Sequence, residues 1–141
     1  MNYIFEYIFV GYFSVAIFLL VHLFIDNIYL TLFITGFAKH QIAHWSNIHR
    51  YFCNYGEACL NNKSVYKSTN IKLNTGSIYE SIAYFILGSI LFYFINPHQL
   101  TNLCFIYFII GILLHYLSEK IGVQNEFCNH SCAIDNPYKQ K

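Results

Sequence analysis

The sequence predicts an all-α, polytopic membrane protein with four transmembrane helices arranged as two repeated helical hairpins. Apolar residues make up 56% of the 141 residues and charged residues only 11%, whereas an average soluble domain has about 25% charged residues. A water-soluble domain of this length could not bury so much apolar side chain. The apolar residues also gather in long runs, and the second half of the chain repeats the pattern of the first.

The first apolar run covers residues 3–24 and is interrupted only by Glu6 and His22. A helix needs about 20 residues to cross the hydrocarbon layer of a bilayer, so this run is long enough. Asp26 and Asn27 follow it and predict a tight turn. A positive n-region and a small-residue cleavage pattern are both missing, so we expect a retained helix rather than a signal peptide.

The second apolar run, residues 28–38, is too short to cross a bilayer by itself. It reaches that length only if the helix continues through Lys39 and His40 to about Trp45. A lysine side chain can snorkel toward the headgroups, and tryptophan favours the membrane interface. We therefore predict a second span that ends near Trp45.

The second half of the chain predicts two more spans, at residues 79–95 and 103–117. Asn96-Pro97 separates them, because proline cannot continue a helix. Residues 46–77 are polar and predict a loop that begins with a short interfacial helix. The predicted division of the single membrane domain, residues 1–141, is repeat 1 at 1–59, a polar loop at 60–77, repeat 2 at 78–134 and a short polar tail at 135–141.

The internal repeat appears when the sequence is shifted by 75 residues, which aligns residues 27–54 with 102–129 without a gap. The identical pairs that are not purely apolar include Asn27 with Asn102, Gly36 with Gly111, His40 with His115, Cys53 with Cys128 and Asn54 with Asn129. Any two apolar helices match somewhat by chance, but chance explains these pairs least well. The repeat predicts two hairpins related by an approximate two-fold axis along the membrane normal.

The positive charges predict the orientation in the membrane. All eight Lys and Arg residues lie in the central loop, at its margins or in the tail, and the two short connections contain none. The loop and the tail are separated by two helices, so they lie on the same side. The positive-inside tendency then predicts that this side is the cytoplasm or a matrix.

Histidine and glutamate residues form the first candidate site. His40 and His44 are four residues apart, as are His115 and Glu119, and this spacing places each pair on one helix face. The candidate metal ligands are His40, His44, His115, Glu119, Glu80 and His49. Such a set could hold zinc or iron, and facing His40 and His115 could instead be the axial ligands of a haem. The competing interpretation is that these side chains are solvated at headgroup level or hydrogen-bonded between helices.

Four cysteines form the second candidate site: Cys53, Cys59, Cys128 and Cys132. They could form two disulfides, bind zinc, or cycle as redox thiols that pass electrons to a quinone. Disulfides require an oxidising compartment and therefore conflict with a cytoplasmic loop. The Cys53–Cys59 spacing is wider than zinc motifs usually have, and the lack of a CxxC motif argues against redox cycling.

These observations leave three functional hypotheses. The chain is a structural or accessory membrane subunit, a membrane metal- or haem-binding protein, or a thiol–disulfide or quinone-linked membrane oxidoreductase. The expected partners are the lipid bilayer and either other membrane subunits or a second copy as a homodimer. Nucleic acid is not expected, because the net charge is only +1 and no basic stripe is present. His22 and Asp26 form a polar pair at the end of the first apolar run. We interpret this pair as part of a solvated turn rather than as one end of a proton path.

Overall fold

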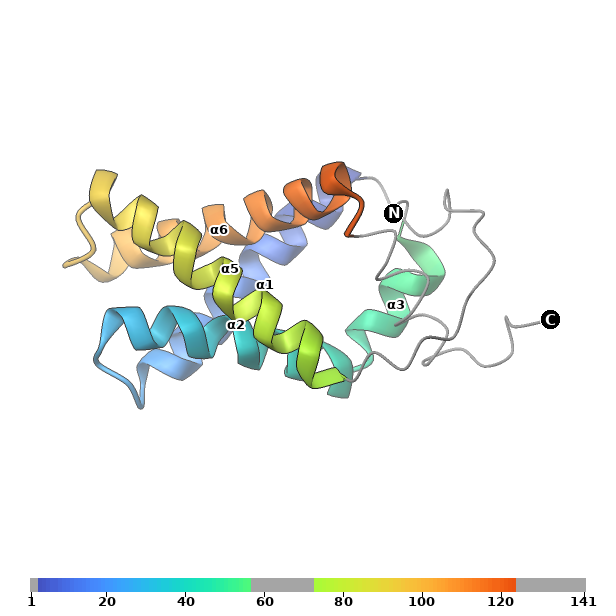
Figure 1. Ribbon diagram of the computed structural model, residues 1–141, viewed down its shortest axis with the longest axis horizontal. Helices are drawn as coiled ribbons and strands as arrows, with labels where there is room; N and C mark the ends of the chain where they lie inside the picture. Colours follow the sequence, from blue (N-terminus) through green and yellow to red (C-terminus); the bar gives the residue numbers. More distant parts are fainter. Residues whose placement is uncertain (1–2, 57–72, 124–141) are drawn as a thin grey trace.

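The computed structural model describes residues 3–56 and 73–123, and all the regular structure in these ranges is helical (Figure 1). The helices are α1 (Tyr3–His22), α2 (Ile28–Trp45), α3 (Ile48–Tyr55), α5 (Leu73–Phe94) and α6 (Leu100–Ile121). The turns at residues 23–27 and 95–99 lie at one end of the molecule, which we call the turn-side end. The helix α3, the start of α1 and the end of α6 lie at the opposite, loop-side end (Figure 1).

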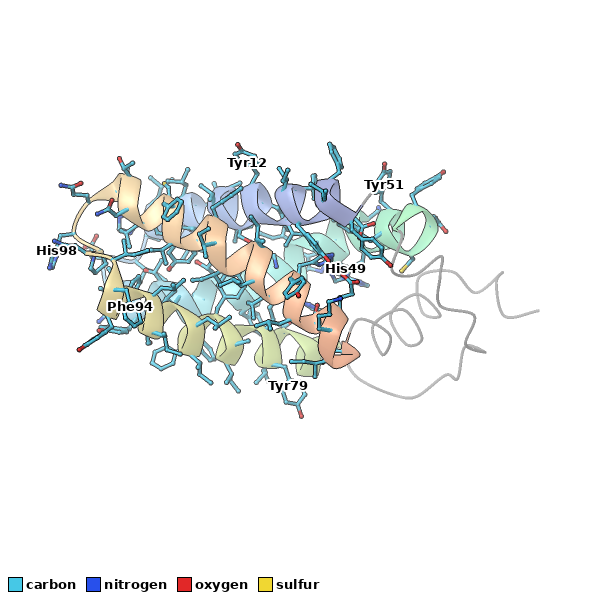
Figure 2. The ribbon with its side chains drawn as sticks, turned by 90° about the horizontal axis from the view of Figure 1, so that it is seen from above. Tyr12, His49, Tyr51, Tyr79, Phe94 and His98 are labelled. Carbon is cyan, nitrogen blue, oxygen red and sulfur yellow. The ribbon has the colours of Figure 1, made fainter. Side chains whose placement is uncertain are left out.

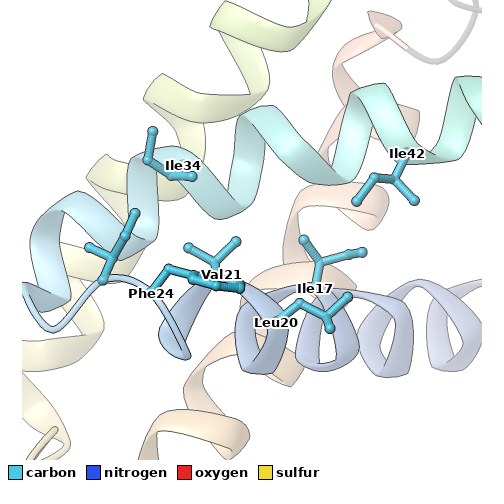
Figure 3. A pocket seen from close by; sticks show the side chains of 7 residues that line it. Ile17, Leu20, Val21, Phe24, Ile34 and Ile42 are labelled. Carbon is cyan, nitrogen blue, oxygen red and sulfur yellow. The ribbon is translucent and has the colours of Figure 1, made fainter.

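The helices pair across the two halves of the chain rather than within them. The most extensive packing joins α2 to α5 and α1 to α6, whereas α1 and α2 touch less and α5 and α6 least of these four pairs. An open groove therefore remains between α1 and α2, and its lining is entirely apolar (Figure 3). The side chains that line it are Ile17, Leu20, Val21, Phe24, Ile25, Ile34 and Ile42.

Glycines explain how closely the paired helices approach. A Cβ at Gly36 of α2 would lie 2.8 Å from the Cα of Ser81 in α5, so the two backbones touch there. A Cβ at Gly111 of α6 would lie 3.0 Å from the Cα of Gly11 in α1. Small residues allow this kind of backbone contact between membrane helices.

The burial pattern differs from that of a water-soluble protein, because polar side chains share the interior with the hydrophobic core while large apolar side chains cover the outside. Fully buried side chains include many polar ones, among them Ser14, Thr31, Thr35, Ser77 and Ser81. Large apolar and aromatic side chains point outward instead, as Tyr12, Tyr79 and Phe94 do in Figure 2. Contiguous exposed apolar surface of this extent needs a lipid environment.

Among the described residues, three helical segments are long and apolar enough to cross a bilayer: Tyr3–His22, Gly76–Phe94 and Leu100–Ile121. The prediction of an all-α integral membrane protein is therefore confirmed at this level. The short helix predicted at the start of the polar loop is present as α3. By contrast, α5 begins at Leu73, so residues 73–77 of the predicted polar loop are helical.

Helix ends follow ordinary local chemistry. The Asn27 side chain accepts hydrogen bonds from the backbone N–H groups of Tyr29 and Leu30, at 3.1 Å each, and so caps the start of α2. Gly122 ends α6 with a φ of 88°, a left-handed conformation that favours glycine. The turn predicted at Asp26-Asn27 is therefore confirmed.

Candidate functional site

A buried ion pair joins α2 to α5 in the loop-side half of the bundle. The Lys39 Nζ lies 2.5 Å from Glu80 Oε1, and the side chains are only 11% and 21% exposed. The other carboxylate oxygen, Glu80 Oε2, lies 3.0 Å from His40 Nδ1. The position of Lys39 in the sequence predicts a side chain that snorkels to the surface. This prediction is wrong, because Glu80 provides a partner inside the bundle.

The surroundings of the ion pair are polar and closely packed. The Lys39 ammonium lies 5.3 Å from the centre of the Tyr84 ring, a distance at which cation and ring attract each other. Gln41 donates a hydrogen bond of 2.9 Å to Ser77 across the α2–α5 interface. A Cβ at Gly76 would lie 2.9 Å from His40 Nε2, so the imidazole packs directly against the α5 backbone.

Three histidines meet at the loop-side end. The ring of His49, on α3, lies 4.8 Å from the ring of His40 and 6.1 Å from that of His44, measured between centroids. Burial, together with the neighbouring His40, lowers the pKa of His49 to about 3. His49 is therefore neutral at physiological pH.

A second group of polar side chains joins α1 to α6 at the same end of the molecule. His115 Nε2 lies 3.5 Å from Glu6 Oε2, and Glu6 is 1% exposed. The Tyr7 hydroxyl donates a hydrogen bond to Glu119. The Tyr7 ring also lies edge-on to His115, with centroids 5.4 Å apart.

The predicted metal ligands therefore fall into two groups. His40, His44, His49 and Glu80 lie together around α2, whereas His115 and Glu119 contact α1. Within the described ranges, no group of three or more His, Cys, Asp or Glu side chains is arranged to hold a metal ion. The zinc, iron and haem assignments therefore stay predictions.

Sequence reasoning missed several members of these groups. Glu6 was noted only as an interruption of an apolar run, Lys39 was expected to snorkel toward the headgroups, and Tyr7 and Tyr84 were not considered. The available signal was the presence of a carboxylate and an ammonium within helices that were predicted to cross a bilayer. Such groups almost always find a partner inside the bundle.

The cysteine prediction is only partly within the described residues. Cys53, on α3, is buried and is not a free thiol, whereas Cys104 on α6 is free. Cys59, Cys128 and Cys132 lie outside the described residues. Their disulfide, zinc and redox roles therefore stay predictions.

Acidification is expected to destabilise the protein through His49. The folded pKa of about 3 lies below the ordinary value of 6.5, so neutral His49 contributes stability that is fully present above pH 6.5. That stability is lost as the pH falls from 6.5 toward 3, because the unfolded state then binds the extra proton. At about pH 5 the loss is about 2 kcal/mol relative to about pH 7.5.

Equilibrium unfolding in detergent at both pH values measures this loss. The readout is the difference between the natural protein and His49→Gln, since all other side chains are the same in both. We expect the variant to lose about 2 kcal/mol less on acidification. An equal loss in the two proteins would contradict the assignment to His49.

No family model, curated protein or solved structure matches the chain, so the functional conclusion depends on the geometry described above.

Proposed function

We propose that the chain is a four-span membrane protein made of two equivalent hairpins, and that it serves as a structural or accessory subunit of a membrane assembly. The observation that carries the proposal is the mutual pairing of its buried ionisable side chains. Lys39 and His40 each contact one carboxylate oxygen of Glu80, and Glu6 contacts His115. Buried charges that pair in this way connect helices without requiring a ligand.

The fourth span in this proposal is α2. Its 18 residues give a length of about 27 Å, close to the ~30 Å hydrocarbon layer. Its polar residues lower its mean hydropathy, but Lys39 and Gln41 are buried against α5. Lipid therefore does not contact these side chains, and the helix can lie in the bilayer despite them.

Tag accessibility tests this fourth span. An epitope inserted after Asp26 and the same epitope inserted after Ser46 are expected on opposite sides of sealed vesicles, because α2 separates them. An epitope after Pro97 serves as a control and should share the side of the first. Access to both the Asp26 and the Ser46 tags from one side would exclude a spanning α2.

Equivalent contacts support the two-hairpin part of the proposal. Gly36 and Gly111 are related by the shift of 75 residues, and each faces the backbone of the other hairpin's first helix. His40 and His115 are related by the same shift, and each contacts a glutamate of that helix. At the centre, Tyr84 and Ser14 form a hydrogen bond of 2.6 Å between α5 and α1, the first helices of the two hairpins.

The outer surface supports the accessory role. Aromatic and aliphatic side chains cover it along the length of the helices, and the groove between α1 and α2 is entirely apolar (Figure 3). Such a surface suits contact with lipid and with the apolar faces of other membrane helices.

Native gel electrophoresis of gently solubilised membranes tests this role. We expect the protein to migrate as part of an assembly. The mass of this assembly should exceed that of a single 16.6-kDa chain with its bound detergent. A photoreactive residue in place of Tyr12, which is 66% exposed, should crosslink to a defined neighbour in intact membranes. A protein that is monomeric in native membranes, with crosslinks to lipid only, would contradict the accessory role.

A metal site is the second candidate function, and one contact favours it. Glu80 orients His40 through Nδ1, as carboxylates do for metal-bound histidines, and two further histidine rings lie nearby. Metal analysis of the purified protein, before and after incubation with zinc, tests this alternative. Stoichiometric zinc that is lost in both His40→Ala and His49→Ala would favour it over the purely structural role, and a metal-free protein would exclude it.

A further inference from the structure

One exposed tyrosine differs from the others on the outer surface in its depth. Four exposed tyrosines of the described helices lie near helix ends: Tyr29, Tyr79, Tyr93 and Tyr116. Near a helix end the hydroxyl reaches headgroups and water, as is usual for tyrosine in membrane proteins. Tyr12 instead lies at the middle of α1 and points away from the bundle, with an exposed fraction of 66% (Figure 2).

The position of Tyr12 places its hydroxyl inside the hydrocarbon layer. The 20 residues of α1 span about 30 Å, which matches the thickness of that layer. Tyr12 is therefore about 15 Å from either boundary, which is farther than a tyrosine side chain extends. Neither water nor lipid headgroups can provide a hydrogen bond at this depth.

The Tyr12 hydroxyl makes no hydrogen bond with any residue that the structure describes. Its ring packs edge-on against the Phe108 ring of α6, with centroids 5.0 Å apart. Phe108 packs so closely on α1 that a Cβ at Gly11 would lie 2.8 Å from its ring. The hydroxyl is thus held on the outer face, and an unpaired hydroxyl in hydrocarbon is costly. This position therefore indicates a partner that supplies a hydrogen bond from outside the bundle.

The exposed residues around Tyr12 have the spacing of a helix-packing seam. They alternate at four and three residues, which is the heptad spacing that packs two helices at a shallow, left-handed crossing. Ala16 follows Tyr12 in this row, and its small side chain allows a second helix to approach closely. We call this row the α1 seam: Phe5, Phe9, Tyr12, Ala16 and Leu19.

A second copy of the chain fits the α1 seam. A hydroxyl both donates and accepts, so Tyr12 is its own complement. Two copies that insert in the same orientation can be related by a two-fold axis along the membrane normal, and the same seam then faces itself. In such a parallel pair, equivalent heptad positions meet, so Tyr12 faces Tyr12 of the second copy. None of the seam residues is charged, so no repulsion opposes the contact.

We propose that the protein forms a parallel homodimer through the α1 seam, with a hydrogen bond between the two Tyr12 hydroxyls at its centre. One hydroxyl donates and the other accepts, so each gains the partner that it lacks within one copy. The apolar seam residues pack against their counterparts on both sides of this bond. The dimer does not depend on the accessory role, because purified protein in lipid should form it without another subunit.

Energy transfer in lipid vesicles tests the dimer. Full-length copies that carry a donor or an acceptor fluorophore at the C-terminus are reconstituted together over a range of protein-to-lipid ratios. The transfer should follow a monomer–dimer equilibrium. Tyr12→Phe removes only the hydroxyl and should raise the apparent Kd by about three- to tenfold, the usual effect of losing one hydrogen bond between membrane helices.

The matched control is Tyr93→Phe, which removes an exposed hydroxyl near the end of α5. Headgroups and water can satisfy that hydroxyl, so the apparent Kd should equal that of the natural protein. Absence of energy transfer at every protein-to-lipid ratio would overturn the proposal, and so would equal Kd values for Tyr12→Phe and the natural protein.

Site-specific crosslinking locates the contact without changing Tyr12. A photoreactive residue in place of Leu19 lies on the seam, whereas one in place of Ile86 lies on the exposed face of α5. When two copies with different tags are expressed together, the Leu19 position should crosslink them and the Ile86 position should not. Crosslinks from Leu19 only to lipid or to a different protein would overturn the second copy as the partner.

Discussion

Lys39→Met is expected to destabilise the folded protein by about 3–5 kcal/mol, the largest effect of a single substitution that we predict. The change preserves most of the side-chain volume but leaves the Glu80 carboxylate without the ammonium that lies 2.5 Å away. A buried carboxylate without a counter-charge must either remain unpaired in a medium of low polarity or take up a proton. Equilibrium unfolding with SDS in mixed micelles measures the loss.

A rescue variant and a matched lysine make this prediction specific. Glu80→Gln added to Lys39→Met should recover most of the lost stability, because no buried charge then remains. Lys120→Met should cost less than about 1 kcal/mol, because Lys120 is exposed over the Tyr116 ring. A double variant less stable than Lys39→Met alone would show that the carboxylate does not depend on Lys39.

The sequence could predict the helices because composition alone demands a lipid-facing surface. Apolar runs located α1, α5 and α6, and the aligned Gly36 and Gly111 extended the prediction to α2, which hydropathy alone leaves short. The start of α5 was less predictable. Residues 73–77 look like loop because most of them are polar, but Gly76 packs against His40 of α2, and Ser77 is fully buried and bonds Gln41.

The candidate site was harder to predict because a single sequence does not specify which helices are neighbours. His40 and His44 both lie on α2, as their spacing predicts, and Glu80 of α5 contacts His40. No sequence pattern pairs Lys39 with Glu80 or His115 with Glu6, because each contact joins the two halves of the chain. Charges inside apolar runs were the usable signal, and their partners follow only from the packing of α2 on α5 and of α1 on α6.

Gly36→Leu is expected to destabilise the protein by about 3 kcal/mol, and Gly36→Ala by a smaller amount. Even the Cβ of alanine would lie 2.8 Å from the Cα of Ser81 and 2.9 Å from the carbonyl oxygen of Glu80. Both contacts are with backbone, which cannot rotate away as a side chain can, so α2 and α5 must separate. Alanine has a higher helix propensity than glycine by about 1 kcal/mol, which favours the variant. A net loss of stability in Gly36→Ala would therefore show that the close contact between α2 and α5 outweighs this gain.

Two further glycines turn this result into a test of helix packing. Gly111→Ala should cost about as much as Gly36→Ala, because its Cβ would meet the Val10 carbonyl oxygen at 2.9 Å and the Gly11 Cα at 3.0 Å. Gly88→Ala should cost less, although its nearest contact is closer at 2.3 Å, because that contact is the end of the Leu32 side chain. Equilibrium unfolding of the three alanine variants gives the order. If Gly36→Ala and Gly111→Ala both stabilise the protein, the helix backbones do not touch at these positions, and the pairing of α2 with α5 and of α1 with α6 is wrong.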